Sequence, residues 1–168
     1  MAQTGGSKSN PNRPPRPPMH PLRVARKFAH RAAFEEFVRL GPPTQSPGDL
    51  LPGQEFYVGS SHVVMGFGSG RREPADGDRP AILLRNYDRD VWLGLPGTSH
   101  NMSRNHNFYG TTPSSYSYWS VPAPAGSYFF CHYEVIPHGV LYRLKGKLKD
   151  DTFRDMRFWL QDRFFPRP

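Results

Sequence analysis

The sequence contains a single cysteine, Cys131, among its 168 residues. An internal disulfide is therefore excluded, which fits a reducing compartment such as the cytoplasm. No apolar run approaches the roughly 18 residues that a membrane-spanning helix needs. No apolar stretch follows the positive charges near the N-terminus either, so we expect no secretory signal. These absences predict a cytoplasmic protein that does not enter a membrane.

Patterns for metals and cofactors are also lacking. Two histidine pairs, His100 with His106 and His132 with His138, have spacings that fit no standard zinc site, and exposed or hydrogen-bonded histidines are expected instead. The glycine-rich segment 66–70 is not followed by a helix that could bind a phosphate, so a loop is the better interpretation. We expect neither a metal nor a cofactor.

Positive charge is in excess. The net charge is +8, and residues 1–50 alone carry eight Lys/Arg against three Asp/Glu. Such a balance favours a polyanionic partner, either a nucleic acid or an acidic protein, although a basic protein without such a partner has the same composition.

Two segments precede the main domain. Residues 1–22 form a basic, proline-rich arm that we expect to be disordered, since proline fixes φ and removes donors. The arm either docks as a polyproline segment or touches phosphates, or it is a solvated extension. Residues 23–50 contain a helix with 3.6-residue periodicity, from Val24 to Leu40, and a linker. Its basic first half is either a face for RNA or a partner, or part of a helix packed on the sheet.

From Leu51 onward the pattern changes to short β-type segments separated by Gly, Pro, Asn and Asp. The segment from Asp150 to Pro166 has helical spacing instead, with Phe153, Met156, Leu160 and Phe164 at intervals of three and four. Residues 51–168 therefore predict a mainly β fold: a small SH3-like barrel of about five to six strands with a C-terminal α-helix. The predicted strands are Glu55–Val58, His62–Phe67, Pro80–Leu84, Val91–Leu95, Ser117–Val121 and Tyr128–Val135.

One arrangement of residues points to chemistry. Arg79 stands at the start of one predicted strand, and Thr98 and Ser99 follow the end of the next. If the two strands pair through the turn at 86–90, the cation and the hydroxyls approach one cleft. A fixed cation beside a hydroxyl donor suits a phosphoryl group in transfer, and the basic charge makes RNA the first substrate to consider.

Four segments, in the same order, resemble the MazF/PemK toxin family. Residues 52–58 (PGQEFYV) resemble its opening strand, residues 79–84 (RPAILL) its R-P-aliphatic strand, and residues 95–99 (LPGTS) its P-x-T-[ST] strand end. Residues 144–148 (LKGKL), with the helix that follows, resemble its G-x-L motif and C-terminal helix. The order and spacing agree from about Leu51 to Phe165, while residues 1–50 have no counterpart in the minimal family domain.

The resemblance implies a sequence-selective endoribonuclease of a toxin–antitoxin pair, usually a homodimer, that cleaves single-stranded RNA without a metal. The RNA 2′-OH attacks the adjacent phosphorus. The family's catalytic arginine and threonine correspond to Arg79 and Thr98. A cognate antitoxin would be the protein partner.

Elementary chemistry is compatible with these roles. Arginine presents a planar fork of donors to phosphate oxygens, but it stays protonated and is a poor base. Arg79 is therefore assigned charge stabilisation, Thr98 orientation of the phosphate, and Ser99 a second donor. Alternatively, Arg79 forms a surface ion pair with Asp76 or Asp78, and Thr98 with Ser99 forms a turn.

Candidate RNA-binding residues lie in two further segments. Cations and aromatic rings can contact phosphates and stack on unpaired bases, although the same residues would also suit a polar surface loop. The candidates are Arg71, Arg72, Glu73, Asn101, Arg104, His106 and Tyr109.

Two other functions remain open at this point. The barrel could be a non-catalytic module that binds nucleic acid or a partner peptide, because SH3-like barrels serve many functions. A toxin with another target, such as a topoisomerase, is the third hypothesis.

Overall fold

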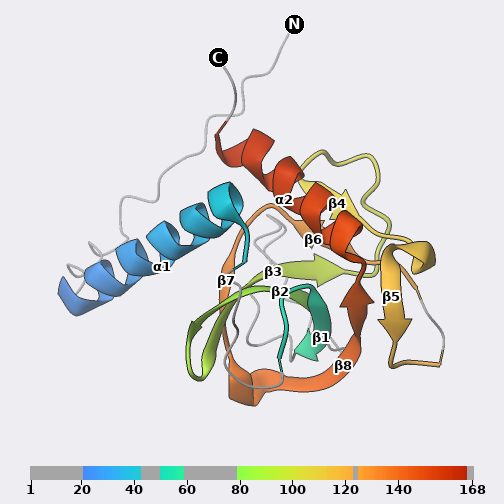
Figure 1. Cartoon of the computed structure of the whole chain (residues 1–168), viewed down its shortest axis with the longest axis horizontal. Helices are drawn as coiled ribbons and strands as arrows, with labels where there is room; N and C mark the ends of the chain where they lie inside the picture. Colours follow the sequence, from blue (N-terminus) through green and yellow to red (C-terminus); the bar gives the residue numbers. More distant parts are fainter. Residues whose placement is uncertain (1–20, 43–49, 59–78, 123–124, 166–168) are drawn as a thin grey trace, which may run out of the picture.

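The computed structural model describes residues 21–42, 50–58, 79–122 and 125–165. The predicted strand His62–Phe67, the candidates Arg71, Arg72 and Glu73, and most of the N-terminal arm lie outside these residues. The described residues form helices and strands with the following bounds (Figure 1): α1 (Pro21–Leu40), β1 (Gln54–Val58), β2 (Arg79–Asp88), β3 (Val91–Thr98), β4 (Phe108–Gly110), the 3-10 helix Pro113–Ser115, β5 (Tyr116–Trp119), β6 (Tyr128–Phe130), β7 (Glu134–Pro137), the 3-10 helix His138–Val140, β8 (Leu141–Leu148) and α2 (Asp150–Phe164).

The strands build one antiparallel sheet in the order β4-β6-β3-β2-β1-β8-β5, and β7 also pairs with β3. The mainly β fold with a C-terminal helix is therefore confirmed. The described chain has eight strands rather than about five or six. The predicted strand Tyr128–Val135 divides into β6 and β7, and β4 and β8 are not among the predicted strands. Strand β8 was hard to recognise because its lysines, arginine and glycine are depleted in strands.

The sheet is curled, as the path of β1, β2, β3 and β8 in Figure 1 shows, and its edge strands are β4 and β5. No backbone ladder joins β4 to β5 within the described residues. A side-chain contact joins them instead: the hydroxyls of Thr111, just after β4, and Tyr116, the first residue of β5, are 3.0 Å apart. The predicted barrel is thus a curled sheet that no backbone ladder closes within the described residues.

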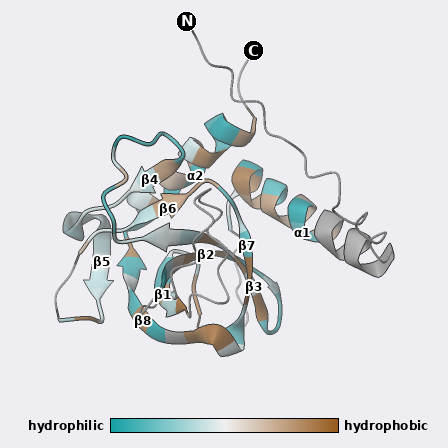
Figure 2. Ribbon diagram, turned by 180° about the vertical axis from the view of Figure 1, so that it is seen from behind, coloured by the Kyte–Doolittle hydropathy of each residue, from teal (hydrophilic) through white to brown (hydrophobic). Residues whose placement is uncertain are grey.

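Alternation along the strands divides the core into two clusters. Ile82 and Leu84 of β2 pack with both helices, whereas their neighbours Ala81 and Leu83 pack with Trp92 on the opposite face of the sheet. Successive side chains of a strand point to opposite faces, so one ten-residue strand serves both clusters. Figure 2 shows the apolar residues distributed along the curled strands.

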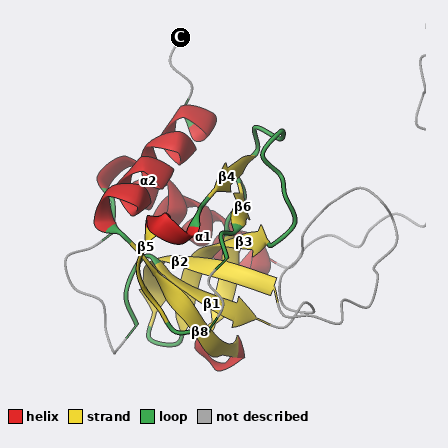
Figure 3. Cartoon of the chain, turned by 90° about the vertical axis from the view of Figure 1, so that its right-hand side faces the viewer, coloured by secondary structure: helices red, strands yellow, loops and turns green. Residues whose placement is uncertain are grey.

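Both helices cover the same face of the sheet (Figure 3). Helix α1 buries Phe34, Phe37 and Val38, so its second half packs on the sheet. Ala32 and Leu40 are exposed, and Leu40 is 77% accessible. Each residue turns the helix by about 100°, so positions 34, 37 and 38 share the face that contacts the sheet, while positions 32 and 40 do not.

Helix α2 buries Met156 and Leu160, as its spacing predicts. Asp150 and Asp151 lie in its first turn, where negative charge stabilises the helix dipole. Neither caps the helix, because the capping position is Lys149, whose side chain makes no capping hydrogen bond. Among the helices described, neither is long and apolar enough to cross a membrane.

Candidate functional site

Arg79 is the first residue of β2, and Thr98 is the last residue of β3. In this antiparallel pair Ala81 lies opposite Pro96. Continuing that register by two residues on each strand sets Arg79 opposite Thr98. Directly opposite residues of antiparallel strands project from the same face, so the register puts the guanidinium and the hydroxyl on one face of the sheet.

The flanking strands align at the same level. Val58 of β1 pairs with Arg79, and Tyr128 of β6 pairs with Thr98. Strands β2 and β3 are in contact here, because a Cβ added to Gly97 would lie 3.1 Å from a carbonyl oxygen of β2. Arg79 and Thr98 therefore belong to one row of residues that crosses four strands.

The hydroxyl of Thr98 is engaged with His100. Thr98 is 4% exposed, and its Oγ1 accepts a hydrogen bond of 3.2 Å from the backbone N–H of His100. The same Oγ1 lies 3.2 Å from His100 Nδ1. This is the local turn that threonine forms with the residue two positions on. An imidazole in contact with a hydroxyl can exchange a proton with it, so His100 joins the candidate site. The sequence analysis had weighed His100 only as a metal ligand.

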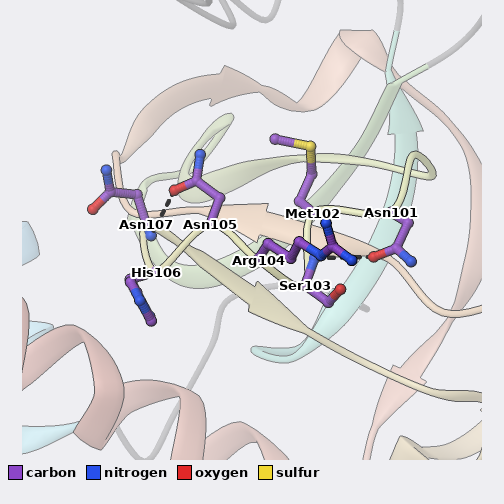
Figure 4. Close-up of a pocket in the computed structure, with 7 residues that line it drawn as sticks. All are labelled: Asn101, Met102, Ser103, Arg104, Asn105, His106 and Asn107. Atoms are coloured by element: carbon purple, nitrogen blue, oxygen red, sulfur yellow. Dashed lines mark hydrogen bonds between the residues drawn. The ribbon is translucent and has the colours of Figure 1, made fainter.

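The loop Asn101–Asn107 follows β3 and surrounds an open cavity of about 750 Å³, as Figure 4 shows. Three predicted RNA-binding residues lie here, namely Asn101, Arg104 and His106, and all three are exposed. Ser99 is exposed at the bend between β3 and this loop. The structure therefore places four predicted binding residues directly after Thr98 in one surface segment.

Tyr109 lies elsewhere. Its hydroxyl donates to the Thr152 carbonyl oxygen at 3.3 Å, and its ring packs on Trp159 with 5.7 Å between centroids. Tyr109 also pairs with Phe129, whose side chain belongs to the helix-covered cluster. Its ring thus faces α2, on the face of the sheet opposite to Thr98.

A cluster of buried polar residues, absent from the sequence predictions, lies under the helix-covered face. Glu55 Oε1 accepts hydrogen bonds from Ser127 Oγ at 2.6 Å and from Lys145 Nζ at 3.0 Å. Glu55 Oε2 accepts one from the Tyr116 hydroxyl. Lys145 Nζ also donates to Ser127 Oγ at 2.6 Å. Thr111 completes this group, hereafter the buried polar cluster, by accepting from the Ser127 N–H at 2.8 Å.

The cluster is closed to solvent. Glu55 is 0% exposed and Lys145 is 3% exposed. A serine beside a lysine can form a nucleophile–base pair, but the Lys145 ammonium also donates to the Glu55 carboxylate, and the pair is shut off from any substrate. Burial, followed by the nearby Glu55 charge, raises the pKa of Tyr116. The arrangement is therefore a self-satisfied polar core that holds strands together.

Its place in the chain connects it to the candidate site. Ser127 directly precedes Tyr128, the residue that pairs with Thr98. Glu55 lies on β1, three positions before Val58, which pairs with Arg79. The row of Arg79 and Thr98 has β1 on one side and β6 on the other. The buried polar cluster thus holds the strands on both sides of the candidate pair.

The remaining titratable candidates do not form a reactive pair. Burial raises the pKa of the Cys131 thiol to about 11, so the thiol stays protonated at neutral pH. Burial lowers the pKa of His132, whose Nε2 lies 3.7 Å from Glu134 Oε1. Among the residues described, no group of three or more His, Cys, Asp or Glu side chains is placed to hold a metal ion.

Comparison with known proteins finds similarity among solved structures. No protein-family model matches the chain, and no curated protein matches it. An endoribonuclease in complex with its cognate antitoxin, from a mycobacterial species, is 16% identical with a TM-score of 0.42, covering 71% of this chain and 99% of that one. The Mycobacterium tuberculosis toxin MazF-mt6 is 16% identical with a TM-score of 0.41, covering 53% and 88%. A mycobacterial endoribonuclease is 15% identical with a TM-score of 0.42, covering 72% and 97%.

Two of these structures are named as endoribonucleases and the third as a MazF toxin, and the sequence resemblance pointed to the same class of protein.

Proposed function

We propose that this chain is a toxin-type endoribonuclease that cleaves single-stranded RNA without a metal. In the reaction the RNA 2′-OH attacks the adjacent phosphorus, a P–O bond forms, and the bond to the 5′ oxygen of the next nucleotide breaks. The products are a 2′,3′-cyclic phosphate and a 5′-OH. Arg79 and Thr98 are the residues proposed to act on the phosphate.

The observation that supports this proposal is the β2–β3 register, in which Ala81 lies opposite Pro96 and whose continuation by two residues brings Arg79 opposite Thr98. The guanidinium of Arg79 can donate two hydrogen bonds to the non-bridging oxygens as negative charge develops on them. Thr98 and then Ser99 provide hydroxyl donors beside the same phosphate.

His100 is proposed to move the proton. Arginine cannot serve as the base because it stays protonated. The imidazole of His100 contacts the Thr98 hydroxyl at 3.2 Å and is exposed to solvent. It can accept the proton of the 2′-OH or deliver one to the leaving oxygen.

The RNA strand is proposed to continue over the loop Asn101–Asn107. Arg104 supplies positive charge there, and no Asp or Glu occurs from Val91 to Tyr133. Arg71, Arg72 and Glu73 stay proposed contacts on the basis of the sequence alone.

The direct test is incubation of the purified protein with single-stranded RNA in EDTA, followed by gel analysis of fragments and their termini. Arg79→Ala should slow cleavage about 100- to 1,000-fold, as loss of one transition-state donor does elsewhere. Arg89→Ala is the matched control, because Arg89 is exposed in the turn between β2 and β3. Full activity in a folded Arg79→Ala protein would refute the assignment.

His100→Ala tests the proton-transfer role separately. We expect a slower reaction and a pH–rate profile of different shape, while RNA affinity changes little. An unchanged pH–rate profile would remove His100 from the mechanism.

We further propose a homodimer in the cytoplasm that is neutralised by an antitoxin. With a net charge of +8, the chain suits an acidic partner segment that competes with RNA for the same surface. Light scattering of the purified protein tests the dimer. Suppression of growth arrest by a co-expressed acidic partner tests the antitoxin.

One observation favours the alternative, a module that binds nucleic acid or a peptide without cleaving. Thr98 is only 4% exposed, and its hydroxyl is already bonded to His100. RNA binding without fragments in the EDTA assay would support this alternative.

A further inference from the structure

The loop Asn101–Asn107 presents hydrogen-bond donors outward and has already used many of its acceptors. The Asn101 side-chain oxygen accepts from the Ser103 N–H at 3.0 Å, and the Asn105 side-chain oxygen accepts from the Asn107 N–H at 3.0 Å. A backbone N–H can only donate, so each carboxamide must turn its oxygen inward. Its NH₂ group therefore points away from the turn.

Backbone acceptors of the loop are also engaged in hydrogen bonds within the protein. The carbonyl oxygens of Met102, Asn105 and Asn107 accept from the N–H groups of Asn105, Phe108 and Cys131, at 2.9, 3.0 and 2.8 Å. No carboxylate lies between Val91 and Tyr133 to add an acceptor.

The donors have no competing partners. Within the described residues neither carboxamide NH₂ group, nor the guanidinium of Arg104, makes a hydrogen bond. All three side chains are exposed around the cavity that Figure 4 shows. The side chains of Ser103 and Asn107 can each donate or accept a hydrogen bond, so they do not distinguish a ligand that accepts from one that donates. The cavity therefore offers two amide donors and one cationic fork.

We propose that this loop selects keto bases, with the O6 atom of guanine or the O4 atom of uracil directed to its donors. Adenine and cytosine carry an amino donor at the corresponding position. Placed against the NH₂ groups and the guanidinium, that donor would stay unpaired and lose its bond to water. The inference deepens the proposed function, since it assumes that the loop contacts the RNA strand.

The test uses fluorescent octamers of 2′-O-methyl uridine and 2′-O-methyl cytidine, which have one ring and differ in the C4 keto or amino group. The methyl group blocks the attacking hydroxyl, so anisotropy measures binding whether or not the protein cleaves RNA. The uridine octamer should bind at least about fivefold more tightly, as one well-placed base contact allows.

Two variants assign the preference to the loop. Asn105→Asp keeps an oxygen for the Asn107 N–H but replaces the NH₂ donor with a second oxygen, so the ratio should move toward cytidine. Arg104→Lys keeps the charge but loses the planar fork, so the ratio should fall. Ser120→Asp is the control: it adds the same charge at an exposed position outside the loop and should leave the ratio unchanged.

The outcomes are separable from those of the cleavage assay. Equal affinity for the two octamers, or no binding to either, would overturn the inference. So would a preference that survives unchanged in both loop variants. A uridine preference that both variants reduce would support it even if the protein cuts no RNA, in which case only the nuclease proposal falls.

Discussion

The buried polar cluster and the loop Asn101–Asn107 are both rich in hydrogen-bonding side chains, yet they use them in opposite ways. In the cluster, Glu55, Lys145 and Ser127 bond to one another and exclude solvent. In the loop, the carboxamide oxygens close local turns and the NH₂ groups face outward. Polar groups that satisfy one another stabilise a fold, whereas polar groups left unpaired at the surface are available to a ligand.

The two regions differ in how far apart in the sequence their hydrogen-bonded residues lie. The cluster brings together residues 72 and 90 positions apart in the sequence, on strands that meet because the sheet curls. The loop bonds span only two positions and leave the remaining donors to the solvent. Substitutions in the first region should therefore change stability, and those in the second should change recognition.

The largest effect is expected for Lys145→Met. The substitution keeps the length of the side chain but leaves the Glu55 carboxylate buried without its cation, which costs about 3–5 kcal/mol of unfolding free energy. Urea unfolding measures the loss. Lys149→Met is the matched control, because Lys149 is exposed and its side chain makes no capping bond.

The double variant Glu55→Leu with Lys145→Met sharpens this prediction. Removing both charges should recover part of the stability lost in the single variant, since no uncompensated ion remains. A loss below about 1 kcal/mol in Lys145→Met would mean that the ion pair does not stabilise the curled sheet.

A smaller effect is expected for Thr111→Val. Valine has nearly the same shape, but the Ser127 N–H loses its acceptor and Tyr116 loses a hydrogen-bond partner, for a cost of about 1–3 kcal/mol. Thr112→Val removes the neighbouring hydroxyl, whose bonds are exposed, and should change stability by less than about 0.5 kcal/mol. Equal losses in the two variants would contradict the contrast between buried and exposed hydroxyls.

The cluster also predicts a dependence on alkaline pH. Burial and the Glu55 carboxylate raise the pKa of Tyr116 above the ordinary value of 10.0. The unfolded chain therefore loses this proton first, and stability should fall as the pH rises above about 10, by up to about 1.4 kcal/mol per pH unit. Tyr116→Phe should be less stable at neutral pH but should show a shallower alkaline decline. An identical slope in both proteins would exclude Tyr116 as the source.

The smallest change in stability is expected for Asn105→Asp. The aspartate keeps an acceptor for the Asn107 N–H, so the free energy of unfolding should change by less than about 0.5 kcal/mol. The same variant should nevertheless shift the ratio of uridine to cytidine binding. A loss of stability above about 1 kcal/mol would show that the Asn105 amide supports the fold itself.

Much of the fold could be predicted from local patterns. Strand β3 begins at the predicted Val91, and β2 begins one residue before the predicted Pro80, because uninterrupted apolar segments bounded by turn residues are clear signals. Helix α2 follows from its spacing of three and four. Strand β8 escaped because Lys145 and Gly146 interrupt its apolar pattern, although Lys145 is buried.

The pairing of β2 with β3, on which the prediction of the candidate site depends, is confirmed. Arg79 and Thr98 end two strands of one hairpin, so a short turn almost dictates their alignment. Tyr109 was grouped with the binding residues on sequence proximity, but the pairing of β4 with β6 turns its ring toward α2. His100 was placed by the turn at Thr98, a signal that the sequence carried and that a search for turns after Thr98 would have found.

The sequence by itself determined β1, β2, β3, the C-terminal helix and the order in which Arg79, Thr98 and the asparagine-rich loop follow one another, because periodicity and turn residues act over a few positions. Only the tertiary structure decided that Glu55, Ser127, Lys145 and Tyr116 would meet. The sequence pattern of a strand is the same whether its charged residue faces water or a buried partner. The curl of the sheet brings these partners together.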